Sequence, residues 1–172
     1  MDARTLAILA LAALSVGGCA SSPDPESLTT RPDDFSIAAT ILAPEDDPRS
    51  GRGLPRSLRP ARYIVDPDGI LRASVGPGSR PATIPPPTRQ LTVAQLDHLW
   101  TLARDARLLE SAAQVHNPDL APPAPGLSVA IVEFAEAGRR AAVRIPLDRA
   151  STDSLAAEEL IDHLAELAWV RQ

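Results

Sequence analysis

Residues 61–75 read ARYIVDPDGILRASV, and they give the clearest local signal of structure in the chain. Two short runs with alternating apolar residues flank four residues that are typical of a tight turn. In that turn Pro67 fixes φ, Asp66 can hydrogen-bond back to the backbone, and Gly69 tolerates a positive φ. We therefore predict a β-hairpin in which each strand has one apolar face, formed by Ala61, Tyr63 and Val65 and by Leu71, Ala73 and Val75.

Three further strands are predicted on either side of this hairpin. Residues 35–42 alternate, with one face made of Phe35, Ile37, Ala39 and Ile41. Residues 127–135 are apolar on both sides, as expected of a central strand. After a turn at residues 136–139, residues 140–145 alternate again, with Ala141, Val143 and Ile145 inward.

Two amphipathic helices follow the strand pairs. Thr92 stands three residues before Gln95, which is the spacing of a capping box, so a helix is predicted from there to about Leu109. A second helix is predicted to begin near Ser154, whose hydroxyl can cap it. The expected buried stripes are Val93, Leu96, Leu99, Trp100 and Ala103 in the first helix, and Ala157, Leu160, Ile161, Leu164, Leu167 and Ala168 in the second.

The resulting order is βββαββα, which predicts an α+β fold. We expect an antiparallel sheet of about five strands with both helices on one face, because each apolar helix stripe needs a sheet to cover. Residues 43–58, 76–88 and 111–126 are rich in proline and glycine and are predicted to be loops. A strand-strand-helix unit occurs twice, which fits either a duplication or, as we favour, two helices built from a small set of residue types.

The first part of the chain has the features of an export signal. Residues 6–16 form an apolar run behind Arg4 that is too short to span a bilayer, which takes about 20 residues. The run ends at Val16-Gly17-Gly18-Cys19, which resembles the lipobox of bacterial lipoproteins. That resemblance implies that the Cys19 thiol receives a diacylglycerol and that the chain is cut before Cys19.

The same resemblance implies a division of the chain and a location. Residues 1–18 would be the signal peptide, residues 19–32 a flexible tether rich in Ser, Pro and acidic residues, and residues 33–172 a single domain. The lipid would anchor the protein in a membrane of the cell envelope. Ala20, which follows the cysteine, favours the outer membrane facing the periplasm if the organism has two membranes.

The hairpin region also resembles an uncharacterised group of small secreted or lipid-anchored bacterial domains. The resemblance covers about residues 33–170, and it departs from the group's pattern because no cysteines precede the proline. It implies a fold and no activity, since its motif consists of turn and core residues, namely Pro60, Tyr63, Val65, Asp68, Gly69 and Gly76.

Composition excludes some classes of function. The formal net charge is −5, so nucleic-acid binding, which needs a basic surface, is disfavoured. Cys19 is the single cysteine, which rules out an internal disulfide and a cysteine-rich metal site. We expect no cofactor.

The residues that could perform catalysis have simpler interpretations. His98 and His163 could share a metal if the two helices lay side by side, but no third ligand is apparent and His116 is in a loop. Asp97 and His98 are adjacent on a helix and therefore do not face each other. Ser79 lacks the pattern of a nucleophile elbow. We predict no catalytic residue and no metal site.

The most distinctive charged feature is a cluster of arginines that could contact an anionic partner. The structural alternative, which we favour, is a solvated loop; the cluster consists of Arg49, Arg52, Arg56, Arg59 and Arg62. Trp100 and Trp169 are expected to be packing residues.

We expect a non-catalytic, membrane-tethered domain that binds an envelope protein or a ligand through the exposed sheet face or the Pro-rich loops. A small periplasmic enzyme such as a hydrolase is the alternative, and it would need a cleft with converging polar side chains. A third possibility is a structural spacer with no specific ligand.

Overall fold

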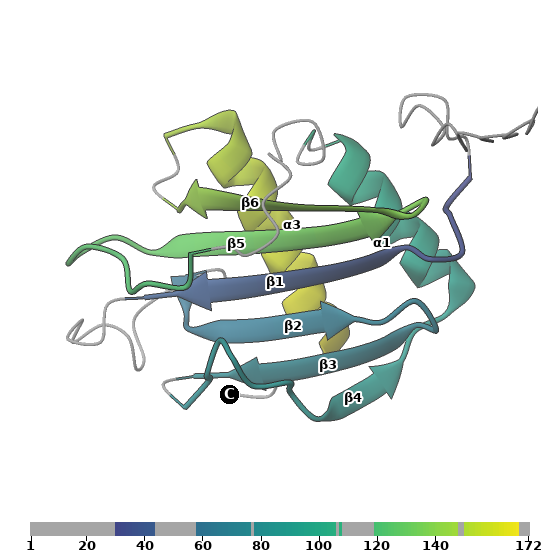
Figure 1. The fold of residues 1–172 in the computed structure, drawn as a ribbon, viewed down its shortest axis with the longest axis horizontal. Coiled ribbons are helices and arrows are strands. Elements are labelled where there is room, and N and C mark those ends of the chain that lie inside the picture. The colour runs from purple at the N-terminus through teal and green to yellow at the C-terminus, as the bar shows by residue number, and fades with distance from the viewer. Residues whose placement is uncertain are drawn as a thin grey trace, which may run out of the picture.

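The computed structural model describes residues 30–43, 58–76, 78–105, 107, 119–147 and 150–168. Within these residues one antiparallel sheet carries both helices on one face, so the α+β prediction is confirmed (Figure 1). The strands are β1 (Ser36–Leu42), β2 (Ala61–Val65), β3 (Ile70–Val75), β4 (Pro87–Gln90), β5 (Val129–Glu136) and β6 (Arg139–Pro146). The helices are α1 (Val93–Asp105) and α3 (Thr152–Ala168).

The described sheet has six strands in the order β4-β3-β2-β1-β5-β6. The first strand in the chain therefore lies in the middle, where Ile37 is opposite both Val65 of β2 and Phe134 of β5. The strand that the sequence did not predict is β4, which overlaps the end of the predicted loop at residues 76–88. It lies at the edge of the sheet, where the missing N–H of Pro87 removes no ladder hydrogen bond.

The predicted hairpin of β2 and β3 is present, with one side-chain role corrected. Its turn is closed by hydrogen bonds from the N–H of Gly69 to the carbonyl of Asp66 (2.8 Å) and from the N–H of Asp66 to the carbonyl of Ile70 (3.0 Å). The side chain that bonds back to the backbone is that of Asp68, which accepts from the N–H of Ile70 (3.1 Å). Asp66 instead pairs with Arg72 across the turn (2.8 Å).

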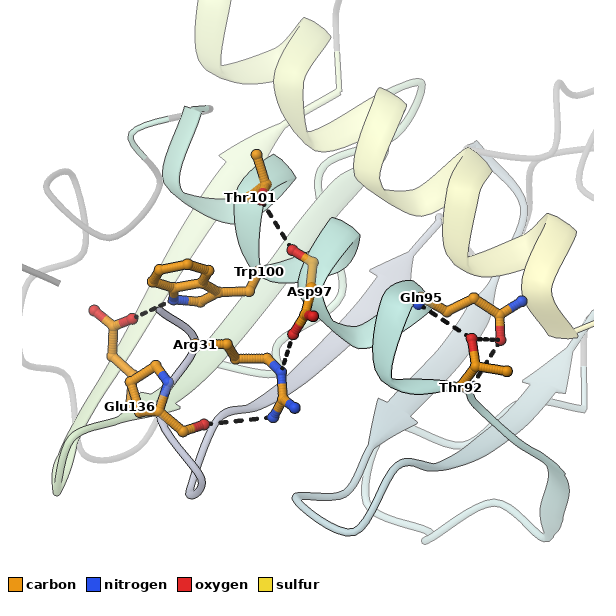
Figure 2. Close-up of polar contacts among 8 residues, drawn as sticks. Arg31, Thr92, Gln95, Asp97, Trp100, Thr101 and Glu136 are labelled. Carbon is orange, nitrogen blue, oxygen red and sulfur yellow. Dashed lines mark hydrogen bonds and ion pairs between the residues drawn. The ribbon is translucent and has the colours of Figure 1, made fainter. Parts of the chain in front are cut away.

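The helix caps show one prediction confirmed and one wrong. The capping box of α1 is formed, because Thr92 N–H donates to Gln95 Oε1 (2.9 Å) and Gln95 N–H donates to Thr92 Oγ1 (3.3 Å) (Figure 2). α3 begins earlier than predicted. Its cap is Ser151, whose hydroxyl accepts from the N–H of Ser154 (3.1 Å), while Ser154 itself is buried in the first turn.

The core fills the space between the sheet and the two helices. Both predicted helix stripes are buried except for Val93, which is 66% exposed because it is the first residue of α1. The described part of α1 ends at Asp105, and Leu109, where we predicted its end, lies outside the described residues. Leu127, predicted to lie in a strand, precedes β5 and is 46% exposed.

Candidate functional site

The face of the sheet opposite the helices is only partly accessible. Thr40 and Ile131 point away from the helices, yet they are 3% and 1% exposed. Near them Arg144 of β6 extends to the loop before β5, where it donates to the carbonyls of Asp119 (2.6 Å) and Ala121 (3.3 Å). The accessible part of this face therefore lies toward the other ends of these strands.

A groove of about 740 Å³ occupies that accessible part, across β2, β1, β5 and β6. Its floor is made of short side chains, among them Ser36, Ala38 and Ala135. One side is formed by the turn that contains Asp66, and the opposite side by β6 around Arg140. The groove is open to solvent along the face of the sheet that the helices do not cover.

Two charged side chains in the groove have no partner among the described residues. Glu133 of β5 is half-buried, and Arg140 of β6 is exposed. The register pairs Glu133 with Ala142 and Arg140 with Ala135, so the two side chains lie diagonally on the same face. By contrast, Asp66 already pairs with Arg72. The groove thus presents a carboxylate and a guanidinium that a ligand could engage.

Sequence reasoning missed these two residues, although a signal for them existed. The two-residue turn at Ala137 and Gly138 sets the register of β5 against β6. That register places Glu133 and Arg140 on the face opposite the inward-pointing Val132 and Ala141. Only the sheet order, however, shows that β1 and β2 continue the same accessible face.

The two helix histidines are brought together, as the sequence allowed. The rings of His98 on α1 and His163 on α3 meet edge to face, with centroids 4.8 Å apart. Nε2 of His163 is buried and has no hydrogen-bond partner. Burial lowers the pKa of His163 and repulsion from His98 adds to this, while the carboxylates of Glu166 and Glu159 act in the opposite direction.

Among the described residues, no acidic side chain joins this histidine pair to make a metal site. Within the described residues there is no group of three His, Cys, Asp or Glu side chains that could hold a metal ion. Asp97, the neighbour of His98 in sequence, faces away and pairs with Arg31 at 2.9 Å (Figure 2). The His98–His163 pair is a contact between the two helices, and it lies on the side of the sheet away from the groove.

The arginine cluster falls only partly on described residues. Arg49, Arg52 and Arg56 lie outside them, as does Cys19. Arg62 is not a loop residue: it lies on β2, is half-buried, and its buried Nε has no hydrogen-bond partner among the described residues. The expectation of a solvated loop therefore does not hold for Arg62, because the strand fixes its side chain against the sheet.

Trp100 is a packing residue, as predicted. It is 6% exposed, and its indole N–H donates to the buried carboxylate of Glu136 (3.2 Å) (Figure 2). The guanidinium of Arg104 lies 4.8 Å from its ring centroid. The other tryptophan, Trp169, and the third histidine, His116, lie outside the described residues.

Two comparisons with known proteins found no match. No protein-family model matches the chain, and no curated protein matches it. In the part of the chain that the structure describes, neither helix is long and apolar enough to cross a membrane.

Proposed function

We propose that this protein is a membrane-anchored lipoprotein of the cell envelope whose domain binds a partner and does not catalyse a reaction. The anchor would be a lipid on Cys19, supported by the short apolar run of residues 6–16 and by the Val16-Gly17-Gly18-Cys19 motif. Two or three acyl chains hold a protein stably at a bilayer, whereas one chain alone does not.

The observation that carries the binding function is the groove on the helix-free face of the sheet. It combines a floor of small side chains with an unpaired carboxylate on Glu133 and an unpaired guanidinium on Arg140. A carboxylate and a guanidinium that lie diagonally on neighbouring strands, with no partner among the described residues, can give orientation and specificity to a bound partner. We take that partner to be another envelope protein, since Ala20 favours the periplasmic side of the outer membrane and the net charge of −5 disfavours nucleic acid.

The enzyme alternative depends on His98 and His163. Their contact is the one arrangement among the described residues that could suggest hydrolysis, because two imidazoles meet there. A general base needs a partner that orients it and a place for the substrate, and the groove lies on the other face of the sheet. Loss of a hydrolytic activity in His98→Gln and His163→Gln variants, with the fold intact, would favour this alternative.

Replacing the anchor residue tests the location. The wild-type protein should fractionate with membranes, resist extraction by high salt, and show the mass of a lipidated Cys19. The Cys19→Ser variant should be soluble and should keep the urea midpoint of the wild type, because the residue precedes the folded domain. A Cys19→Ser protein that stays with the membrane would contradict the lipid anchor.

Filling the groove tests the binding function. Crosslinking in intact envelopes should capture a defined partner, and Ala38→Arg should abolish the capture because a long charged side chain would occupy the floor. Ala94→Arg, on the exposed side of α1, is the matched control and should leave capture unchanged. Equal capture by both variants would show that the groove is not the binding surface.

A further inference from the structure

The groove lies on a part of the sheet whose backbone groups are already used. Its central residues belong to β1 and β5, and each of these strands is paired with a neighbour on both sides. A segment that docks on this face therefore gains no ladder hydrogen bonds and must satisfy its own N–H and C=O groups. An α-helix does so within itself, whereas a single extended strand does not. Among regular structures, a helix therefore suits this face best.

The width of the groove matches that of one helix. Its sides are Asp66, directly after β2, and Arg140 on β6, with β1 and β5 between them. Three strand spacings separate these sides, which amounts to about 14 Å. A helix with its side chains is about 10–12 Å in diameter. The floor residues Ser36, Ala38 and Ala135 are short and only half-buried, so a helix can approach the sheet closely.

The opposite face of the same sheet is already covered by helices. Both α1 and α3 lie there, and the hydrophobic core fills the space between them and the strands (Figure 1). An antiparallel sheet can leave its second face to solvent, but helices on both faces are also a stable arrangement of layers. A helix from a partner would give this sheet its third layer.

Two charges define what such a helix must carry. Glu133 and Arg140 have no partner among the described residues. In the β5–β6 register Arg140 lies opposite Ala135, and Glu133 lies two residues before Ala135 on β5. The two charged positions are therefore about 7 Å apart along the strands. Four residues of a helix rise about 6 Å, so side chains at positions i and i+4 have the matching spacing.

We propose that the groove binds an amphipathic α-helix of another envelope protein, with a carboxylate and a basic side chain four residues apart on the docking face. The carboxylate pairs with Arg140 and the basic side chain with Glu133. The other residues of that face are short and apolar, because they lie against Ala38 and Ala135. This inference rests on the proposed function and names the element by which the partner binds.

A second copy of the chain does not supply this helix from its described residues. α3 contains no Lys or Arg. The described part of α1 has no acidic residue four positions from an arginine, and its Asp97 already pairs with Arg31. The apolar stripes of both helices are also buried in their own core. The charge pattern of the groove therefore favours a different protein.

The test uses the full-length protein in detergent micelles and three helical peptides that differ only at the two charged positions. The first carries Glu at i and Lys at i+4, the second Glu at both positions, and the third Lys at both. A hydrocarbon staple on the far face keeps them equally helical, which circular dichroism checks. Titration calorimetry should show that the wild type binds the first peptide most tightly, because only that peptide has a partner for both Glu133 and Arg140.

Charge variants of the groove should change this preference in a fixed order. Glu133→Arg leaves two arginines and should bind the peptide with two Glu most tightly. Arg140→Glu leaves two carboxylates and should bind the peptide with two Lys most tightly. The matched peptide should exceed each mismatched one by about fivefold, the effect of exchanging one partly exposed ion pair for a repulsion. Arg80→Glu, the same charge change at an exposed residue outside the groove, is the matched control and should keep the wild-type order.

Two further measurements test the helix and the floor. A version of the first peptide with two central prolines and no staple keeps both charges but cannot form the helix, and it should not bind. Ala38→Arg should abolish binding of the first peptide, whereas Ala94→Arg should leave it unchanged. Equal affinity of the helical and the proline-containing peptides would contradict a helical occupant.

The outcome for the helix is separate from the outcome for the proposed function. Failure of the first peptide to bind the wild type, or one order of affinities in all three grooves, would overturn the helix inference. Partner capture in envelopes, and its loss in Ala38→Arg, tests the groove independently of any peptide. Capture that is lost in Ala38→Arg without peptide binding would keep the groove as the binding surface and reject the helix as its occupant.

Discussion

The contact between Trp100 and Glu136 shows how a single pair joins the two layers of the fold. Both side chains are buried, at 6% and 5% exposure, and the indole N–H donates to the carboxylate. A buried carboxylate without a hydrogen bond would be strongly unfavourable, so this donor is what allows Glu136 to lie at the end of β5. The pair thereby fixes α1 relative to the β5–β6 turn.

Removing the indole donor should destabilise the domain measurably. We expect Trp100→Phe to lower the free energy of unfolding by about 1.5–3 kcal/mol, the range for a hydrogen bond to a charged group. Glu136→Gln, which keeps an acceptor oxygen, should cost about 1 kcal/mol or less. Urea unfolding measures both, and the double variant Trp100→Phe with Glu136→Met should lose less than the sum of its single changes. Additive losses would show that the two side chains are not coupled.

Gly69 and Gly138 both have positive φ, so comparing their alanine variants distinguishes the cost of backbone strain from the cost of steric contact. A Cβ at Gly69 (φ +84°) would lie 2.9 Å from Nε2 of Gln90 and 3.1 Å from Cδ1 of Leu96, whereas a Cβ at Gly138 (φ +75°) would meet nothing within 4 Å. Gly138→Ala should therefore cost about 1–2 kcal/mol, the strain of left-handed backbone. Gly69→Ala should cost about 1 kcal/mol more, because the added Cβ would displace the Gln90 amide from its hydrogen bond to the Asp68 carbonyl (2.6 Å). Equal urea midpoints for the two variants would refute the steric contribution.

At the scale of elements, the packing of α1 against α3 includes a contact that depends on protonation. The rings of His98 and His163 meet edge to face, and the carboxylates of Glu159 and Glu166 lie on the His163 side of the same contact. α3 is also held at its C-terminal end, one turn beyond His163, where Arg89 of β4 donates to the carbonyl of Leu167 (3.2 Å). The short edge strand β4 therefore contributes to the position of a helix.

The lowered pKa of His163 predicts weaker stability in acid. The unfolded chain binds a proton at the ordinary value of 6.5, and the folded chain only at a lower pH, so unfolding takes up a proton between these values. The contribution of His163 to stability is therefore complete above pH 6.5 and is lost as the pH falls toward the folded pKa. Urea midpoints should fall less between pH 7.5 and pH 5 in His163→Gln than in the wild type. In His98→Gln, ring titration by NMR should show a higher pKa for His163, and an unchanged value would contradict repulsion between the rings.

The elements differ in how far local sequence could predict them. The hairpin at residues 61–75 and the capping box at Thr92 depend on neighbours in the chain, and both were predicted with their turn and cap residues nearly correct. Ser151 and Ser154 are equally suited to cap α3 by residue type. The choice between them depends on Ser154 being buried against the core, which is a tertiary effect.

At the scale of the whole molecule, the topology argues against a duplicated half-domain. The hairpins β2–β3 and β5–β6 lie on opposite sides of β1, and both β2 and β5 run antiparallel to β1. β2 and β5 are therefore parallel to each other. The second strand of each hairpin lies farther from β1, with β3 on one side and β6 on the other, and both helices cover the same face of the sheet (Figure 1). Such units are related as mirror images, which no rotation of a repeated unit can produce. The shared Asp-His-Leu sequence of the helices thus reflects similar amphipathic composition.

The chain by itself determined the class of the fold, the hairpins, the helix stripes and the interpretation of residues 1–19 as a lipoprotein signal, which stays a prediction. These features rest on periodicity, turn chemistry and caps, which act between residues close together in sequence. Only the tertiary structure placed β1 between the two hairpins, added β4, and brought Glu133, Arg140 and Ala38 to one groove. Those outcomes depend on which strands pair across long loops. The strand pairing follows from burying the apolar residues of all the strands and both helices in one core.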